Sequence, residues 1–104
     1  MGKPRPTFHS LKDGDPVLVQ YFWHNPEGLL EVLTEGEGAV TKVSTRSLVV
    51  ACPRLSIKGR AGVPLVFPPG PMTFSRITGW AWGAEDYGFR LHPKQAQVPP
   101  EEGP

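Results

Sequence analysis

The stretch AVTKVSTRSLVVAC at residues 39–52 decides the fold class of this 104-residue chain. Residues 39–44 alternate between apolar and polar side chains, and residues 47–52 are rich in apolar, β-branched side chains. Two such runs joined by a short link are typical of two antiparallel strands in a hairpin. We therefore predict a β-hairpin that turns at Thr45-Arg46.

Further strands are predicted upstream of this hairpin. Residues 12–16 (KDGDP) have the composition of a turn, and residues 17–22 (VLVQYF) follow as a strand whose two faces are both apolar apart from Gln20. Such a strand is expected to be central in a sheet. Residues 29–34 are compatible with a strand or one helical turn, and we favour a strand. Residues 35–38 (EGEG) are expected to break the chain.

The region downstream of the hairpin is rich in proline and glycine. Residues 53–71 are predicted to form a long loop with at most short edge strands near 55–58 and 63–67, because proline cannot join a central strand. Strand character resumes at residues 72–77 and again at 88–92. The whole chain then has five or six short strands.

Composition sets the domain organisation. The chain contains 12 glycines and 13 prolines, yet 38% of its residues are hydrophobic. Few segments are long enough for a helix, while the apolar content is sufficient for a packed core. We predict a mainly β protein with a single small domain at residues 11–93, a flexible basic arm at 1–10 and a flexible tail at 94–104.

Residues 13–52 carry a resemblance to known folds. The patterns GDxVxV at 14–19, EGxVTKV at 37–43 and LVV at 48–50 resemble the opening of SH3-like small β-barrels, including KOW-type and Tudor-like modules. The resemblance implies a partly open SH3-like barrel, with an OB-like barrel as the alternative, and it favours a nucleic-acid-binding role. Residues 74–91 are also similar to small bacterial and phage proteins of no assigned function.

Charge is distributed unevenly although the net charge is only +1. Residues 13–37 hold six carboxylates and no lysine or arginine, and residues 38–84 hold six cations and no carboxylate. The two blocks either pair across the barrel or form separate faces, of which the basic one would contact phosphates. The candidate phosphate-binding residues are Lys42, Arg46, Arg54, Lys58, Arg60 and Arg76.

Aromatic residues supply a second candidate site. Trp80 and Trp82 share a face if their segment is extended, and they would stack on bases or anchor a protein interface if exposed. Flanking glycines make complete burial of both unfavourable, so we expect one of them in solvent while the other packs in the core. The apolar residues 63–69 either close one end of the barrel or form an exposed patch.

Several classes of protein are disfavoured by the sequence. Cys52 is a lone cysteine, and His9, His24 and His92 lie far apart, so we expect no metal and no cofactor. We find no nucleophile with a base and no phosphate-binding loop, and we expect no enzymatic activity. No apolar run is long enough to cross a membrane, and residues 1–6 lead into no apolar stretch, so a cytoplasmic protein is expected.

Two hypotheses about function remain. In the first, the protein is a nucleic-acid-binding accessory module, in which the six cations contact phosphates and Trp80 or Trp82 stacks on bases. In the second, it is a protein-binding adaptor or inhibitor, for example a phage protein that acts on a host nucleic-acid machine. The near-neutral net charge favours the second hypothesis, because nucleic-acid-binding domains are usually more basic. The resemblance to SH3-like barrels favours the first, which is our leading expectation, with the second as the alternative.

Overall fold

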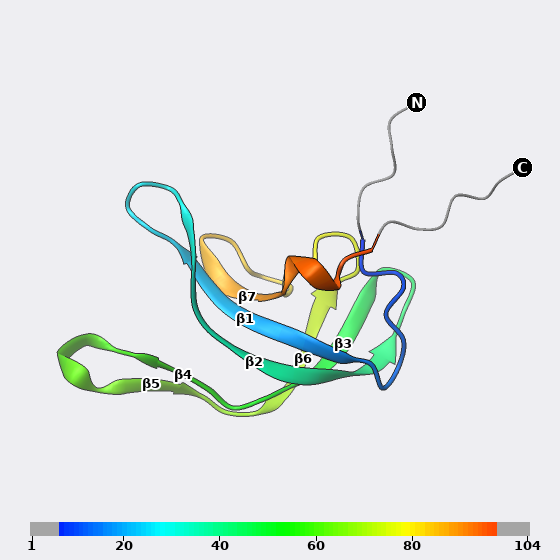
Figure 1. Cartoon of the computed structure of the whole chain (residues 1–104), viewed down its shortest axis with the longest axis horizontal. Coiled ribbons are helices and arrows are strands. Elements are labelled where there is room, and N and C mark those ends of the chain that lie inside the picture. The colour runs from blue at the N-terminus through cyan, green and yellow to red at the C-terminus, as the bar shows by residue number, and fades with distance from the viewer. Residues whose placement is uncertain (1–6, 98–104) are drawn as a thin grey trace, which may run out of the picture.

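A computed structural model describes residues 7–97 and shows seven strands and two short 3-10 turns (Figure 1). No α-helix occurs in this part of the chain. The prediction of a mainly β protein is therefore confirmed. The elements are β1 (Pro16–His24), β2 (Leu30–Val43), β3 (Ser47–Cys52), β4 (Leu55–Lys58), η1 (Arg60–Gly62), β5 (Pro64–Phe67), β6 (Gly70–Ser75), β7 (Tyr87–Leu91) and η2 (Pro93–Gln95).

Five strands form one antiparallel sheet in the order β6-β3-β2-β1-β7, which curls into a half-barrel (Figure 1). Residues 79–82 lie across the gap between the two edge strands. Ala81 forms a bridge with Phe74 of β6, and Trp80 forms one with Arg90 of β7. The Ala81 amide donates to the Phe89 carbonyl at 2.9 Å, and the Trp82 amide donates to the Thr73 carbonyl at 3.1 Å. The predicted small, partly open barrel is confirmed.

The predicted hairpin at residues 39–52 is formed by the end of β2 and by β3. Val43 pairs with Leu48 and Val40 pairs with Val50, so the chain turns at residues 44–47 as expected. Thr41 is an extra residue in β2, and its side-chain hydroxyl donates to the Val49 carbonyl at 3.2 Å. The strand predicted at residues 17–22 is also confirmed, and β1 pairs on both sides, with β2 and with β7.

The predicted break at residues 35–38 is wrong, because β2 runs through it without interruption over 14 residues. Gly36 and Gly38 make room for neighbouring elements instead of turning the chain. A Cβ atom at Gly36 would lie 2.8 Å from the Leu55 side chain, and one at Gly38 would lie 2.6 Å from the Ala51 carbonyl oxygen. Glycine in a strand often marks such a close approach. Residues 30–34 belong to the same strand, so the preference for a strand there is confirmed.

The core lies on the concave side of the curled sheet. Val17 and Val19 of β1 point into it, as do the alternate residues of β3, while Phe74 of β6 and Leu91 of β7 complete it. Alternation along each strand places these side chains on one face. The fully buried members of the cluster are Phe74, Leu48, Leu91, Val17, Val19, Val40 and Val50.

Both ends of the described chain are folded onto the barrel. The Thr7 and Gln97 backbones form two hydrogen bonds, at 3.1 and 2.8 Å, and Phe8 is buried in the core with 4% of its surface exposed. The flexible arm predicted at residues 1–10 and the tail predicted at 94–104 therefore include residues that belong to the folded barrel. Sequence composition did not reveal that Phe8 is a core residue. The rest of both predicted segments, residues 1–6 and 98–104, lies outside the described residues.

Most of the loop predicted at residues 53–71 is a hairpin of β4 and β5 that projects from the barrel, and its last two residues begin β6 (Figure 1). The two short strands fall where the sequence placed them. A two-stranded hairpin needs packing against another element to be stable. Leu55 provides this at the base of β4, where it is buried in the core, and Phe67 packs beside it at the end of β5. The predicted long loop is therefore an ordered arm.

Candidate functional site

The six candidate phosphate-binding cations are not gathered on one face. Lys42 and Arg46 are exposed at the end of the barrel where β2 turns into β3. Arg54 precedes the projecting hairpin and Lys58 ends its first strand, and both are exposed. Figure 1 shows the β2–β3 turn and the hairpin tip at opposite ends of the molecule. The backbone of Arg60 lies in η1, at the tip of the hairpin.

Arg76 has a structural role. Its Nη1 donates to the Ser44 carbonyl at 2.6 Å and its Nη2 donates to the His9 carbonyl at 2.7 Å. The guanidinium therefore ties the β2–β3 turn to the segment before β1. Among the described residues, its buried Nε has no hydrogen-bond partner. Arg76 contributes to the fold through these contacts and is poorly placed to meet a phosphate.

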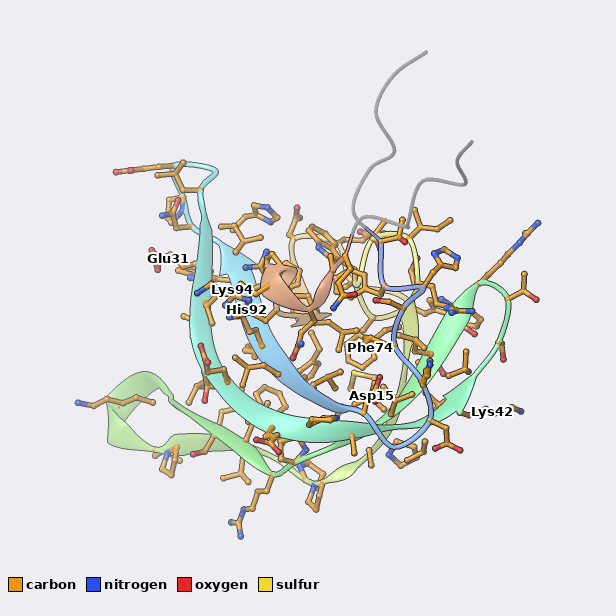
Figure 2. All side chains as sticks on the ribbon, turned by 45° about the vertical axis from the view of Figure 1, so that its right-hand side comes forward. Asp15, Glu31, Lys42, Phe74, His92 and Lys94 are labelled. Carbon is orange, nitrogen blue, oxygen red and sulfur yellow. The ribbon has the colours of Figure 1, made fainter. Side chains whose placement is uncertain are left out.

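The carboxylates of the acidic block accept hydrogen bonds from neutral groups. Glu31 accepts from the Trp23 indole at 3.3 Å and from the Asn25 amide at 3.1 Å, and Glu35 accepts from the Gln20 amide at 3.4 Å. The donors to Glu31 and Glu35 are thus tryptophan, asparagine and glutamine side chains, and no lysine or arginine of the basic block is among them. Figure 2 shows Glu31 and Lys42 on opposite sides of the barrel.

The two tryptophans around Ala81 have different environments. Trp80 is half-buried against the Phe22 ring, with 4.7 Å between ring centroids, and the His24 ring lies near both, 6.0 Å from Phe22 and 6.3 Å from Trp80. Trp82 has 67% of its surface exposed. The expectation that one of the two is in solvent is confirmed, and Trp82 is that residue.

An apolar groove that the sequence did not indicate lies between the barrel and the β4–β5 hairpin. Its centre is a cluster of three rings, in which Tyr21 lies 4.5 Å from Phe67 and 5.0 Å from Phe89, and Phe67 lies 5.1 Å from Phe89, measured between centroids. Each ring comes from a different strand: β1, β5 or β7. Phe67 thus closes one end of the barrel, whereas Val63 and Leu65 of the same apolar stretch stay exposed.

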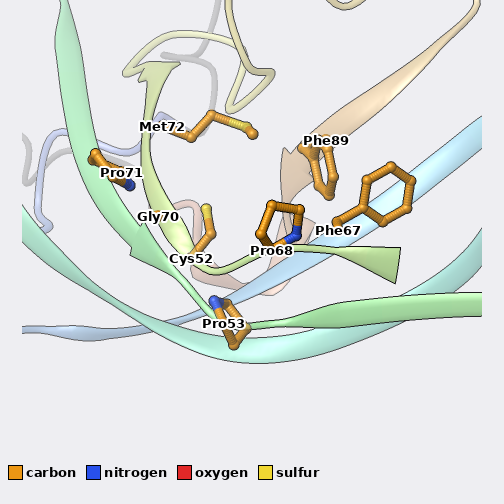
Figure 3. Close-up of a pocket in the computed structure, with 8 residues that line it drawn as sticks. All are labelled: Cys52, Pro53, Phe67, Pro68, Gly70, Pro71, Met72 and Phe89. Carbon is orange, nitrogen blue, oxygen red and sulfur yellow. The ribbon is translucent and has the colours of Figure 1, made fainter. Parts of the chain in front are cut away.

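Two adjoining cavities form this groove. The larger, of about 300 Å³, lies between the ring cluster and the exposed side chains of Trp82 and Tyr87. The smaller, of about 200 Å³, lies among Cys52 and prolines at the base of the hairpin (Figure 3). The two share Phe67, Met72 and Phe89. We call the whole the aromatic groove, and its principal residues are Tyr21, Phe67, Met72, Trp82, Tyr87 and Phe89.

Cys52 lines the smaller cavity as an apolar group. It is 8% exposed, and burial raises the pKa of its thiol from 9.0 to about 11. The nucleophilic thiolate is therefore disfavoured at neutral pH. The pKa of Tyr21 in the larger cavity is raised as well, first by burial and second by the neighbouring Tyr87.

The thiol of Cys52 gives an expected pH dependence of stability. Between pH 9 and about 11 the thiol ionises in the unfolded chain but not in the folded one. The folded state then binds more protons, so stability falls as the pH rises through this window. We expect the thermal midpoint to fall further in the wild type than in Cys52→Ala, by about 4 to 8 °C for each kcal/mol of stability that is lost. Thermal unfolding of both proteins across this pH range is the measurement, and parallel curves would contradict the assignment.

The histidines take part in local hydrogen bonds. His92 Nδ1 accepts from the Lys94 amide at 2.9 Å and so caps η2, while His24 Nδ1 lies 3.1 Å from the Asp86 carbonyl. His9 Nδ1 lies 2.9 Å from the Thr7 hydroxyl. In the described part of the chain, no three His, Cys, Asp or Glu side chains are grouped as metal ligands would be. The same residues include no helix that could cross a membrane.

Comparison of the chain with protein-family models, curated proteins and solved structures finds no match. The aromatic groove is therefore assessed from its own geometry. It is preformed, largely apolar and open to solvent, which are properties of a binding site.

Proposed function

We propose that the protein is a non-enzymatic protein-binding module, an adaptor or inhibitor, and that the aromatic groove is its binding site. The observation that carries the proposal is the position of Trp82 and Tyr87, which are 67% and 66% exposed beside a preformed cavity. Exposed apolar surface of this kind is characteristic of interaction sites. Tryptophan and tyrosine beside a pocket are also the residues that most often dominate the binding energy of protein interfaces.

The distribution of cations supports a protein partner over a nucleic acid. Binding to phosphates requires several lysines or arginines along one path. Here Lys42 and Arg46 lie at one end of the molecule, Arg54 and Lys58 lie at the base and along the first strand of the projecting hairpin, Arg76 is engaged by carbonyl groups, and none of these cations lines the groove. The proposal retains the cytoplasmic location, which rests on the sequence alone.

Single-stranded nucleic acid is the second candidate partner. The observation in its favour is again the pair of exposed rings, because Trp82 and Tyr87 offer flat faces on which bases could stack. Anisotropy of labelled single-stranded DNA and RNA at about 50 and 200 mM salt tests this candidate. Micromolar binding that is lost at the higher salt and in Trp82→Ala would replace the protein partner with a nucleic acid.

The protein-binding proposal is tested with the variant Trp82→Ala/Tyr87→Ala. We expect it to lose at least about tenfold in partner capture. Truncation of an anchor residue of this type to alanine often costs about 2 kcal/mol or more of binding free energy, and about 1.4 kcal/mol is a factor of ten in affinity. The measurement is quantitative capture from a lysate of the source cells, with the immobilised protein as bait.

The matched control for this experiment is Val63→Ala/Ile77→Ala. Both residues are exposed to a similar degree, at 66% and 60%, and neither lines the groove. The control should capture the same proteins as the wild type. Equal capture by the wild type and by both variants would refute the proposal that the groove is the binding site.

A further inference from the structure

The walls of the aromatic groove carry carboxylates. Trp23 and Tyr87 are paired across β1 and β7, as are Tyr21 and Phe89, so all four side chains lie on the same face. Glu31 is paired with Trp23 across β1 and β2, and its carboxylate accepts a hydrogen bond from the Trp23 indole. A negative charge is thereby held on the groove side of the hairpin that β1 and β2 form.

Two further carboxylates lie in the loop before β7. Glu85 and Asp86 are exposed, and they stand between Ala84 and Tyr87, both of which line the larger cavity. The Glu85 amide donates to the Tyr87 carbonyl, and the Asp86 carbonyl accepts from the His24 amide at 2.7 Å. These backbone bonds keep the acidic loop at the mouth of the groove.

Nearby cations lie on the opposite faces of the same strands. In β4, Leu55 and Ile57 share one face, paired with Phe67 and Leu65 of β5, so alternation places Lys58 on the other face. In β7, Arg90 points away from Phe89, and its Nε donates to Gln20 at 3.0 Å. The residues that line the two cavities are therefore apolar, the carboxylates lie around the end of the groove near Tyr87, and the exposed Arg54 follows Pro53 at the opposite end.

The shape of the groove suits an extended chain. The two cavities are continuous through Phe67, Met72 and Phe89, and the apolar face of the β4–β5 hairpin prolongs them through Ile57 and Leu65. A row of separate apolar depressions is how extended peptides are commonly recognised, with alternate side chains entering the depressions.

We propose that the aromatic groove binds an extended segment of a partner protein in which apolar residues are flanked by lysine or arginine. This inference rests on the proposed function and adds the chemistry of the partner. The apolar side chains enter the two cavities, and the flanking cations meet Glu31, Glu85 and Asp86. Complementary charge of this kind contributes mainly to selectivity and to the rate of association.

An array of immobilised peptides tests the proposal. Each of many apolar core sequences is presented three times, flanked by lysine, by serine or by glutamate, and single-stranded oligonucleotides are spotted beside them. The full-length labelled protein is applied at low salt and at about 0.5 M salt, which screens exposed charges. We expect the lysine-flanked peptides to be retained about three- to tenfold more than their serine counterparts at low salt, with glutamate flanks weakest.

Two variants assign the result to the groove. Glu85→Lys/Asp86→Lys alters exposed loop residues and should abolish or reverse the flank preference, while Trp82→Ala should reduce retention of every peptide. The measurement at high salt gives the same information without a substitution. The preference for lysine flanks should shrink there, while binding that depends on the apolar residues of the peptide should remain.

The outcomes separate this inference from the proposed function. Equal retention of the three flanks, with loss in Trp82→Ala, would overturn the inference and leave the groove as a protein-binding site. Preference for glutamate flanks would overturn it as well. Retention of no peptide would overturn both proposals, and retention of oligonucleotides through Trp82 would assign the groove to nucleic acid.

Discussion

Phe74→Ala is expected to lower the free energy of unfolding by about 3 to 5 kcal/mol, the usual range for removal of a buried phenylalanine. Phe74 is completely buried and pairs with Leu48 of β3 on one side and with Ala81 of the closing segment on the other. Its ring therefore fills space between β6 and the segment that spans the open side of the barrel. Loss of the ring removes apolar burial and leaves a cavity at the seam.

Chemical denaturation monitored by tryptophan fluorescence measures this effect. Ile77→Ala is the matched control, because Ile77 follows the same strand but is 60% exposed, and the change there should stay within about 0.5 kcal/mol. Equal destabilisation by the two substitutions would mean that the seam beside β6 is not part of the core.

Gly79→Ala is the second substitution with a large expected effect. Gly79 has a φ of +77°, and a Cβ atom there would lie 2.4 Å from the Phe8 ring. The left-handed conformation costs a residue with a side chain about 1 to 2 kcal/mol. The added methyl group must also displace Phe8, which is a core residue, so we expect a total loss of about 2 to 5 kcal/mol.

Gly83→Ala separates the two contributions. Gly83 lies just beyond the same closing segment and has a φ of +88°, but a Cβ atom there meets nothing within 4 Å. It should therefore cost only the backbone term of about 1 to 2 kcal/mol. The difference in unfolding free energy between the two variants measures the contact with Phe8. If both variants are destabilised equally, Phe8 does not pack against Gly79.

Local patterns were sufficient to predict most strands. The hairpin of β2 and β3 and the central strand β1 were predictable, because alternation and a short turn are properties of neighbouring residues. The role of Gly36 was not predictable, because a side chain at this position would collide with Leu55, which lies on another strand. Glycine signals a turn or a close approach equally well, and only the packing of distant elements decides between them.

The aromatic groove was less predictable than the fold. The exposure of one of the two tryptophans could be inferred from the flanking glycines, but the packing of Phe67 against Tyr21 and Phe89 gave no signal because these residues are far apart in the sequence. Charge alone was also misleading for Arg76, whose guanidinium binds two backbone carbonyls. Formal charge in a sequence does not show whether a side chain is already occupied within the fold.

The return of the last strand to the first has a consequence for the order of folding. Pairing of β7 with β1 brings together opposite ends of the chain, and contacts of such high sequence separation form slowly because a long loop must close. Phe89 and Tyr87 of the aromatic groove belong to β7. During synthesis, a chain that has completed only β1 to β6 therefore lacks one wall of the groove. If the groove binds a partner as we propose, only a chain in which β7 is in place can do so, and binding would then report that this strand has been added to the sheet.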